Sequence, residues 1–267
     1  MTTHEFPLSV RAVRAFADNY IWLIDAPRAP GRVLVVDPGD AAPVIAELRR
    51  HGASLAAILL THHHPDHIGG VADLLASGPG PIPVIGPDDA RIGHLTRRMA
   101  DSEMLELPDL GVAFQSLHVP GHTASHIAFF GHGALFCGDT LFSAGCGRLF
   151  EGSAAQMRAS LTRLSELPGA TRVFAGHEYT AANLKFASQA EPDNAAADAY
   201  RMQVEALRSR DQPSLPSTLD IETRVNPFLR CEYPAVRAAA ARHAGRDLPD
   251  GTAVFAALRS WKDGFRA

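Results

Sequence analysis

The sequence THHHPDHIGG occupies residues 61–70 and places four histidines and one aspartate within six positions. A hydrophobic run over residues 56–60 precedes it, and a segment with helical spacing over residues 68–76 follows it. This pattern predicts a buried strand that ends in a histidine-rich loop and continues into a helix. Because loops at strand ends often carry ligand-binding side chains, we expect a metal site at the end of this strand.

The spacing within the motif predicts two pairs of ligands. In an extended segment side chains alternate between faces, so His62 and His64 point the same way and His63 points to the opposite side. Asp66 and His67 lie on the turn into the helix, where they can reach a second ion. A catalytic metal site needs about three protein ligands and an open position. Other parts of the chain must therefore supply the remaining ligands.

Three residues elsewhere occupy the same kind of position, directly after a short apolar strand and beside a glycine. These residues are His122, Asp139 and His177, and we interpret them as the missing ligands. His126 has a spacing that suits a ligand, but we favour packing or support of the ligands for it and for His63. Asp37 follows an apolar run and precedes Pro-Gly, so it is either a turn residue or a support for the histidine-rich loop.

Composition limits the classes of function. A net charge of −4 is too small to indicate nucleic acid or an anionic membrane as a partner. Three cysteines without a CxxC pair argue against a disulfide framework and suit a reducing compartment. The N-terminus lacks the pattern of a signal peptide, and no apolar run approaches the ~18 residues of a membrane span. We therefore expect a cytoplasmic monomer that acts on a small molecule.

The chain changes character near residue 180. Strand-like and helical segments alternate up to that point, as in layered α/β domains. Four helical segments follow without a convincing strand, over residues 181–189, 194–210, 234–243 and 252–261. Residues 211–233 contain three prolines and are expected to form an ordered surface connection. The sequence thus predicts a boundary near residue 177, between an α/β domain over residues 1–177 and a helical domain over residues 178–267.

Several motifs carry a resemblance to a known family. THHHPDH resembles the HxHxDH motif of the metallo-β-lactamase superfamily. The later motifs resemble the glyoxalase II (hydroxyacylglutathione hydrolase) branch; they are GDTLFSAGCGRLFEG (138–152), AGHEYTAANLKFA (175–187), VNPFLR (225–230) and LRSWKD (258–263). The resemblance extends from about residue 11 to the end of the chain. It implies an α/β fold, the αββα metallo-β-lactamase-like sandwich, followed by a small all-helical C-terminal domain.

The resemblance also implies a dinuclear metal site. The first ion would be held by His62, His64 and His122, the second by Asp66, His67 and His177, and Asp139 would bridge them. Zinc is expected, with iron or manganese as alternatives, because ligands rich in imidazole suit these metals better than calcium or magnesium. The implied reaction is the hydrolysis of S-D-lactoylglutathione to D-lactate and glutathione. Asp66 and Asp139 would be the catalytic residues.

The family's substrate implies a site for glutathione, whose carboxylates require cations and hydrogen-bond donors. Arg148, Arg259 and Lys262 would supply positive charge, and Tyr179 would supply a hydroxyl. Phe150 stands where many family members carry a tyrosine, so it can only pack against the substrate. The alternatives are a glutathione-persulfide dioxygenase, another hydrolase of this superfamily, or a metal-binding module without catalysis. The second set of ligands, Asp66, His67 and His177, together with the basic tail motif, argues against the dioxygenase. The module without catalysis is disfavoured because no ligand position is substituted.

Overall fold

The structure, a computed structural model, describes residues 7–78 and 80–266 and divides the chain into two compact units. The first unit extends to His118 and also includes Ser125–Gly138. The second consists of Val119–Ala124 and the chain from Asp139 onward. The predicted domain boundary at residue 177 stays a prediction. The first six residues, which bear on the expected lack of a signal peptide, lie outside the described residues.

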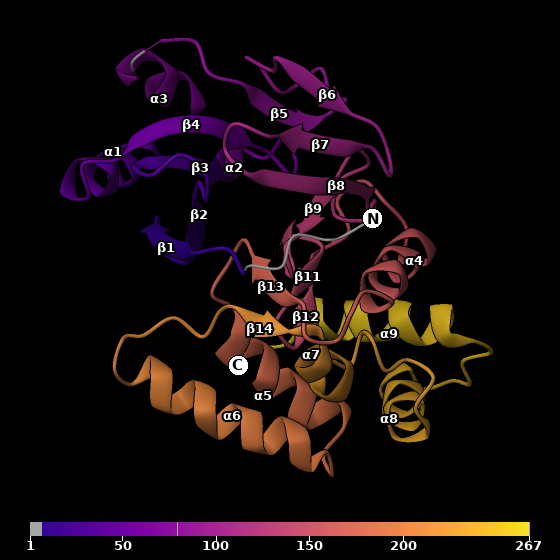
Figure 1. Ribbon diagram of the computed structural model, residues 1–267. Coiled ribbons are helices and arrows are strands. Elements are labelled where there is room, and N and C mark those ends of the chain that lie inside the picture. The colour runs from indigo at the N-terminus through magenta and orange to yellow at the C-terminus, as the bar shows by residue number, and fades with distance from the viewer. Residues whose placement is uncertain (1–6, 79, 267) are drawn as a thin grey trace. The chain divides into compact units, whose positions relative to one another are not determined.

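The first unit contains a six-stranded mixed sheet in the order β1 to β6 (Figure 1). Its strands are β1 (Val10–Ala15), β2 (Asn19–Asp25), β3 (Arg32–Val36), β4 (Ser54–Leu59), β5 (Val84–Pro87) and β6 (Arg97–Met99). The pairs from β1 to β3 are antiparallel, and those from β3 to β6 are parallel. The buried strand predicted over residues 56–60, before the histidine-rich motif, is confirmed as part of β4.

Strands β2 and β3 are buried almost throughout, which explains their continuous apolar sequences. Helices α1 (Ala41–Arg50) and α3 (Val71–Ser77) pack on one face. Val35 and Ile58 belong to this shared core. Helix α1 begins where the side chain of Asp40 accepts a hydrogen bond from the Ala42 amide, a typical N-cap.

Four antiparallel strands of a second sheet complete the first unit. They are β7 (Met104–Leu107), β8 (Val112–His118), β9 (Ile127–Gly131) and β10 (Ala134–Gly138). Phe129 and Phe136 face each other across β9 and β10, and both are fully buried. Strands β3, β4 and β10 end at Val36, Leu59 and Gly138, and each is followed by a segment that carries a candidate site residue.

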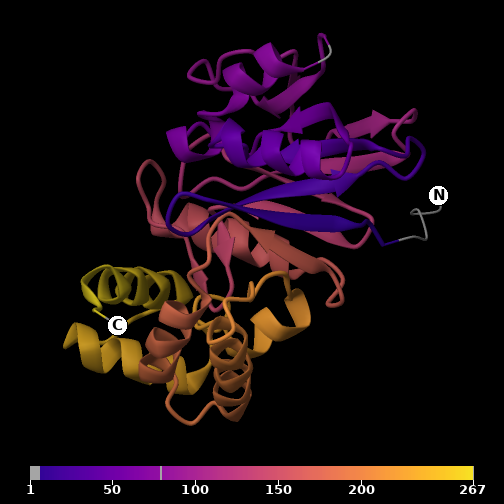
Figure 2. The same ribbon diagram turned by 90° about the vertical axis from the view of Figure 1, so that its left-hand side faces the viewer.

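The second unit is mainly helical (Figures 1 and 2). Its helices are α4 (Ala154–Ser165), α5 (Thr180–Ala190), α6 (Ala195–Arg208), α7 (Leu219–Val225), α8 (Pro234–Ala244) and α9 (Gly251–Gly264). Two short antiparallel pairs accompany them, formed by β11 (Leu141–Phe142) with β12 (Gly145–Cys146) and by β13 (Arg172–Ala175) with β14 (Ser217–Thr218). Among the described residues, no helix combines the length and the apolarity that crossing a membrane requires.

Two predictions about local structure are wrong. Residues 211–233 are not a surface connection, because they include β14 and α7 and bury Asn226 and Phe228. The single helix expected over residues 68–76 is two helices, α2 (Pro65–Ile68) and α3. Gly70 lies at the break, and only glycine fits there, because a Cβ atom would lie 2.5 Å from the backbone nitrogen of Ala41.

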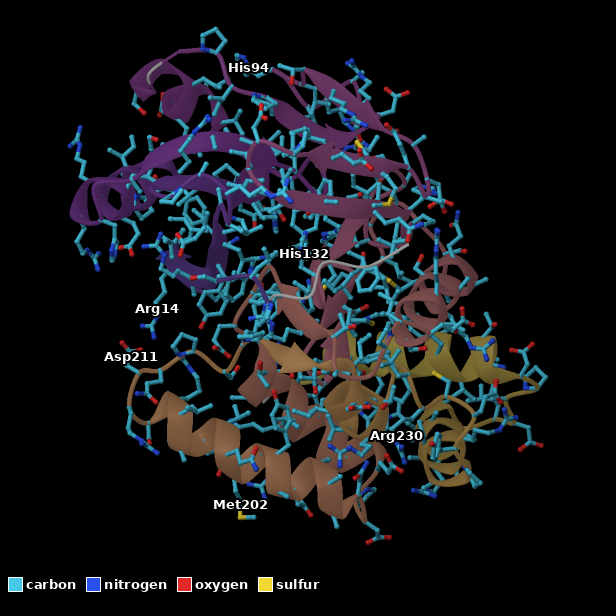
Figure 3. All side chains as sticks on the ribbon, in the orientation of Figure 1. Arg14, His94, His132, Met202, Asp211 and Arg230 are labelled. Atoms are coloured by element: carbon cyan, nitrogen blue, oxygen red, sulfur yellow. The ribbon has the colours of Figure 1, made fainter. Side chains whose placement is uncertain are left out.

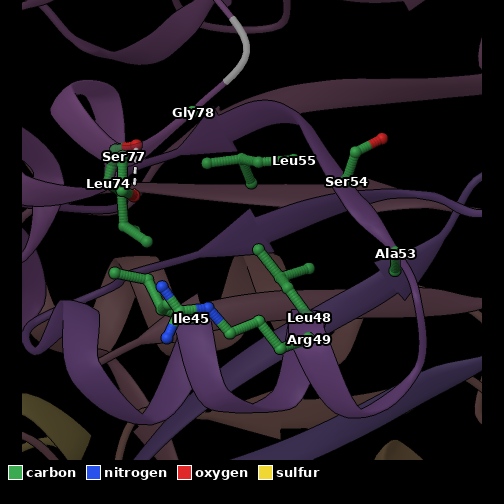
Figure 4. Close-up of a pocket in the computed structure, with 9 residues that line it drawn as sticks. All are labelled: Ile45, Leu48, Arg49, Ala53, Ser54, Leu55, Leu74, Ser77 and Gly78. Atoms are coloured by element: carbon green, nitrogen blue, oxygen red, sulfur yellow. Dashed lines mark hydrogen bonds between the residues drawn. The ribbon is translucent and has the colours of Figure 1, made fainter.

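A pocket of about 350 Å³ lies between α1, α3 and the start of β4 (Figure 4). Its walls are mainly apolar, and Arg49 is its charged residue. The lining residues are Ile45, Leu48, Arg49, Ala53, Ser54, Leu55, Leu74, Ser77 and Gly78. None of them is a predicted site residue, so this pocket is separate from the metal-binding motifs in sequence.

Candidate metal centre

The histidine-rich loop of the first unit brings its predicted ligands together. His62 and His67 are buried, and their ring centroids are 4.2 Å apart. His62 Nε2 lies 3.1 Å from His64 Nδ1. His67 Nε2 lies 3.6 Å from a carboxylate oxygen of Asp66. The loop thus presents two close pairs of possible donor atoms.

These separations fit atoms that share an ion. A tetrahedral zinc ion with bonds of about 2.0–2.1 Å holds neighbouring ligand atoms about 3.3 Å apart. The distances of 3.1 Å from His62 to His64 and 3.6 Å from Asp66 to His67 lie on either side of that value. The chemistry of the donors, imidazole nitrogen and carboxylate oxygen, also suits such an ion.

Asp37 supports this loop through three hydrogen bonds. Its carboxylate accepts from the Thr61 amide at 2.8 Å and from the Thr61 hydroxyl at 2.6 Å. It also accepts from His67 Nδ1 at 3.0 Å. The proton is thereby placed on Nδ1, so Nε2 keeps the lone pair that a metal requires. Asp37 has a φ of 51°, and it is therefore both a turn residue and a support for the loop.

The two histidines that were expected to pack or to support ligands lie beside His62. The buried ring of His126 stacks on that of His62 with centroids 4.6 Å apart. His63 Nδ1 lies 3.5 Å from a carboxylate oxygen of Asp89. Hydrogen bonds from Arg91 hold the pKa of Asp89 well below its usual range. Asp89 is therefore a fixed negative charge behind the loop.

Asn19 is a supporting residue that the sequence analysis missed. Its Nδ2 donates to the Asp66 carboxylate at 3.0 Å, and it lies 3.4 Å from the Asp66 carbonyl. The side chain is buried at the start of β2. An asparagine at a turn between two strands is common, so the sequence offers no signal that this one orients a ligand.

The second unit brings together the other three predicted ligands. Asp139 follows β10, His177 follows β13, and His122 lies in the loop 119–124; all three are buried. One oxygen of the Asp139 carboxylate is 3.4 Å from His122 Nε2 and 3.3 Å from His177 Nε2. The same carboxylate oxygen of Asp139 thus lies close to both imidazoles.

The orientation of these side chains is also set locally. His122 Nδ1 donates to the Arg148 carbonyl at 2.9 Å, which leaves Nε2 directed at Asp139. A Cβ atom at residue 147 would lie 1.9 Å from the Asp139 carbonyl oxygen, so only glycine fits there. The ring of His177 stacks on that of Tyr179 with centroids 4.8 Å apart.

The cysteines are poor candidates for ligands. Cys137, Cys146 and Cys231 are free and buried. Burial raises the pKa of Cys146 to about 11 and that of Cys231 to about 12. Metal binding requires a thiolate, so these side chains are packing residues, as predicted for Cys137 and Cys146.

Two predicted substrate residues lie beside His122. Phe150 is 63% exposed, and its ring meets that of His122 with centroids 5.2 Å apart. Arg148 is exposed, and its Nε lies 3.7 Å from Asp263. An exposed aromatic ring and an exposed guanidinium next to a candidate ligand leave both side chains available to a bound molecule.

The other two cations come from α9 and differ in exposure. Lys262 is partly buried and donates to the Ala182 carbonyl at 3.3 Å, and burial lowers its pKa to about 8. Arg259 is only 6% exposed and donates to the Cys146 carbonyl at 2.8 Å and to Asp263 at 3.0 Å. Its guanidinium is therefore largely occupied within the protein.

Comparison with known proteins matches both parts of the chain to family models. Residues 16–177 match the metallo-β-lactamase superfamily, and residues 178–265 match the hydroxyacylglutathione hydrolase C-terminus. The predicted fold class, a metallo-β-lactamase fold followed by a helical C-terminal domain, is thereby confirmed. With this superfamily match, the histidine–aspartate groups of the two units indicate a dinuclear metal site.

Individual relatives agree with these models. The hydroxyacylglutathione hydrolase of Cupriavidus taiwanensis is 51% identical, with 97% of this chain and 100% of the relative covered. That of Alkalilimnicola ehrlichii is 54% identical over 94% of this chain and 97% of the relative. The crystal structure of TTHA1623 in a di-iron-bound form is 28% identical with a TM-score of 0.57, covering 83% of this chain and 100% of that one. The chain belongs to the hydroxyacylglutathione hydrolase family of the metallo-β-lactamase superfamily.

Proposed function

We propose that the protein hydrolyses S-D-lactoylglutathione to D-lactate and glutathione. One observation carries this proposal beyond family membership: residues suited to glutathione contact the candidate ligands directly. Phe150 packs against His122, the Arg148 carbonyl orients that same histidine, and Tyr179 stacks on His177. A molecule bound by these side chains would have its reactive group beside the metal ligands.

The proposed ligand sets follow the motif. One ion would be held by His62, His64 and His122, the other by Asp66, His67 and His177, with Asp139 shared. Zinc is the proposed metal, and iron or manganese are alternatives that the donors also accept. When bound, two such ions lower the pKa of a water molecule toward ~7 and polarise a carbonyl group.

The protein's own groups would orient this chemistry. Asp66, held by Asn19, would accept a proton from the attacking water and fix its direction. Asp37 would keep His67 in the tautomer that binds through Nε2. The leaving group is a thiolate, and a free thiol has a pKa of about 8.5, so no strong general acid is required. Asp66 and Asp139 are the proposed catalytic residues.

The glutathione part of the substrate would lie against the second unit. Arg148, Arg259 and Lys262 would provide the positive field for its carboxylates, and Tyr179 would donate a hydrogen bond. Phe150 would contribute only packing. We also propose a catalytic region up to residue 177 and a substrate-binding helical region after it, in a protein that works as a cytoplasmic monomer.

A direct test combines metal analysis with a thioester assay. Protein purified without added metal should carry up to about two metal equivalents per chain. It should remove the ultraviolet absorbance of the S-D-lactoylglutathione thioester, and it should consume no oxygen with glutathione persulfide. Fully loaded protein without thioester turnover would refute the proposal. Asp139→Ala should lose both activity and bound metal, and retained turnover would refute the bridging role.

A further inference from the structure

The β11–β12 hairpin, Leu141–Cys146, connects Asp139 to Arg148. It is buried along its whole length, and Ala144 at its turn has a φ of 54°. Each strand has only two residues, and the two strands pair with each other. Buried backbone amides and carbonyls need partners, so most of the hairpin's polar groups must be satisfied from outside it.

Side chains from the C-terminal helices satisfy these groups one after another. Glu222 accepts from the Ala144 amide at 2.8 Å and from the Ser143 hydroxyl at 2.7 Å. Asn226 Nδ2 donates to the carbonyls of Phe142 at 3.2 Å and Gly145 at 2.9 Å.

Two further side chains complete the set. Asn183 Nδ2 donates to the Ser143 carbonyl at 3.0 Å, and Arg259 donates to that of Cys146. Five consecutive residues, 142–146, thus bond through their backbone to four buried side chains.

These four side chains form a matched set for this hairpin. Glu222 and Asn226 are fully buried, and Asn226 Nδ2 also lies 3.2 Å from the Glu222 carboxylate. Asn183 comes from α5, Glu222 from α7, and Arg259 from α9. A buried network of hydrogen bonds favours one geometry. These side chains therefore help to hold the hairpin in its left-handed turn at Ala144.

The hairpin's position reaches the candidate ligands through the backbone that follows it. The Gly147 amide donates to the Thr140 carbonyl at 3.2 Å, which closes the segment onto itself beside Asp139. The next carbonyl, that of Arg148, orients His122. A shift of the hairpin would thus change the directions of His122 and Asp139 together with the position of Arg148.

We propose that Glu222, Asn226 and Asn183 are positioning residues of the active site. They fix the position of the β11–β12 hairpin. Through the hairpin they also fix the distance between the proposed ligands Asp139 and His122 and the proposed glutathione-binding residue Arg148. The helical region thereby shapes the metal ligands as well as the substrate site. The kinetic consequence rests on the proposed function, whereas the consequences for hairpin order and metal affinity do not.

The test compares Glu222→Ala with the conservative Glu222→Gln. Glutamine can still accept from the Ala144 amide and donate to the Ser143 hydroxyl, so it should behave nearly as the original protein. Alanine leaves the Ala144 amide buried without its acceptor. We expect Glu222→Ala to speed hydrogen exchange at the Ala144 amide by about tenfold or more. It should also weaken metal binding and raise the KM for S-D-lactoylglutathione by about tenfold or more.

Glu191→Ala is the matched control in the same unit. Glu191 is a nearly buried carboxylate that accepts hydrogen bonds from Arg230 and Asn194. The Glu191→Ala substitution should lower the melting temperature. It should leave the hydrogen-exchange rate of the Ala144 amide, the metal affinity and the KM unchanged. The proposal is overturned if Glu222→Ala also loses only thermal stability.

Asn183→Ala keeps the proposal testable if Glu222→Ala does not fold. It removes a single hydrogen bond to the hairpin, so the other three side chains remain. Faster hydrogen exchange of the amides of residues 142–146, together with weaker metal binding, supports the proposal. An unchanged exchange rate and an unchanged metal affinity overturn it. If the original protein lacks thioesterase activity, the proposed function fails, but the exchange and metal measurements still decide this inference.

Discussion

At the scale of single residues, the buried groups behind the candidate ligands set their chemistry. Asp37 is the clearest example, because one carboxylate holds the Thr61 backbone, the Thr61 hydroxyl and the His67 imidazole. Its left-handed backbone is a conformation that aspartate and asparagine tolerate better than most residues. A substitution can therefore change the charge without disturbing the turn.

Asp37→Asn should reduce the metal affinity strongly and the free energy of unfolding only slightly. The amide group would present N–H to His67 Nδ1 and force the proton onto Nε2, the atom that should bind the metal. Supporting residues of this kind change metal affinity by about 10–100-fold, and competition with a chelating dye would measure it. Asp25→Asn, in a partly exposed ion pair with Arg11, is the control and should bind metal normally. Unchanged metal affinity in Asp37→Asn would contradict the assigned role.

Lys262 gives the proposed substrate site a pH dependence. Burial lowers its pKa to about 8, so the ammonium loses its proton as the pH rises past that value. The KM for S-D-lactoylglutathione should then rise by up to about tenfold between pH 7 and pH 9. Lys262→Arg keeps its charge at these pH values, and its KM should rise less. Parallel pH profiles of the two proteins would show that Lys262 does not bind a carboxylate.

The same lowered pKa has a consequence for stability with a definite sign. The unfolded chain, with a lysine pKa near the ordinary 10.5, binds more protons than the folded protein between pH 8 and pH 10.5. The contribution of Lys262 to the free energy of unfolding therefore increases with pH over this range. Urea unfolding of the protein and of Lys262→Met at pH 7.5 and pH 9.5 would show this difference.

At the scale of elements, the sequence predicted the strands that lead into the candidate ligands but not the structure of segment 211–233. Apolar strands followed directly by a histidine or an aspartate beside glycine were recognisable, because both the burial and the ligand have local signals. Helix α7 and strand β14 have none: three prolines suggested a loop, and β14 pairs with a strand more than forty residues away. Glu222 was missed for the same reason, because only tertiary contacts show that it is buried.

Phe228→Ala tests whether this segment belongs to the core. Phe228 is 2% exposed and packs against Phe186 and Phe255. The substitution should lower the free energy of unfolding by about 3–5 kcal/mol, whereas a surface connection would lose less than about 0.5 kcal/mol. Met202→Ala is the control, because Met202 is 60% exposed and points outward from α6 (Figure 3). Equal effects of both substitutions in urea unfolding would place the segment at the surface.

At the scale of the whole molecule, the proposed ligands come from loops that are far apart in the chain. Residues 62 to 177 supply them, and the region after residue 177 supplies the side chains that hold the β11–β12 hairpin. Metal binding should therefore be linked to the folding of the entire chain. An unfolded chain cannot assemble these donors, so the binding free energy contributes to stability.

Metal removal is the corresponding experiment. Each site, at a free zinc concentration about 100-fold above its Kd, should add about 2.7 kcal/mol to the free energy of unfolding. For a chain of this size, one kcal/mol raises the melting temperature by about 2–4 °C. With two sites, chelation should therefore lower the melting temperature by about 10–20 °C, and zinc should restore it until about two equivalents are bound. Magnesium should not restore it, because it prefers oxygen ligands. An apo protein that melts at the same temperature as the loaded one would show that the donors are not assembled around a metal, since ligands that stabilise only the folded state must raise its melting point.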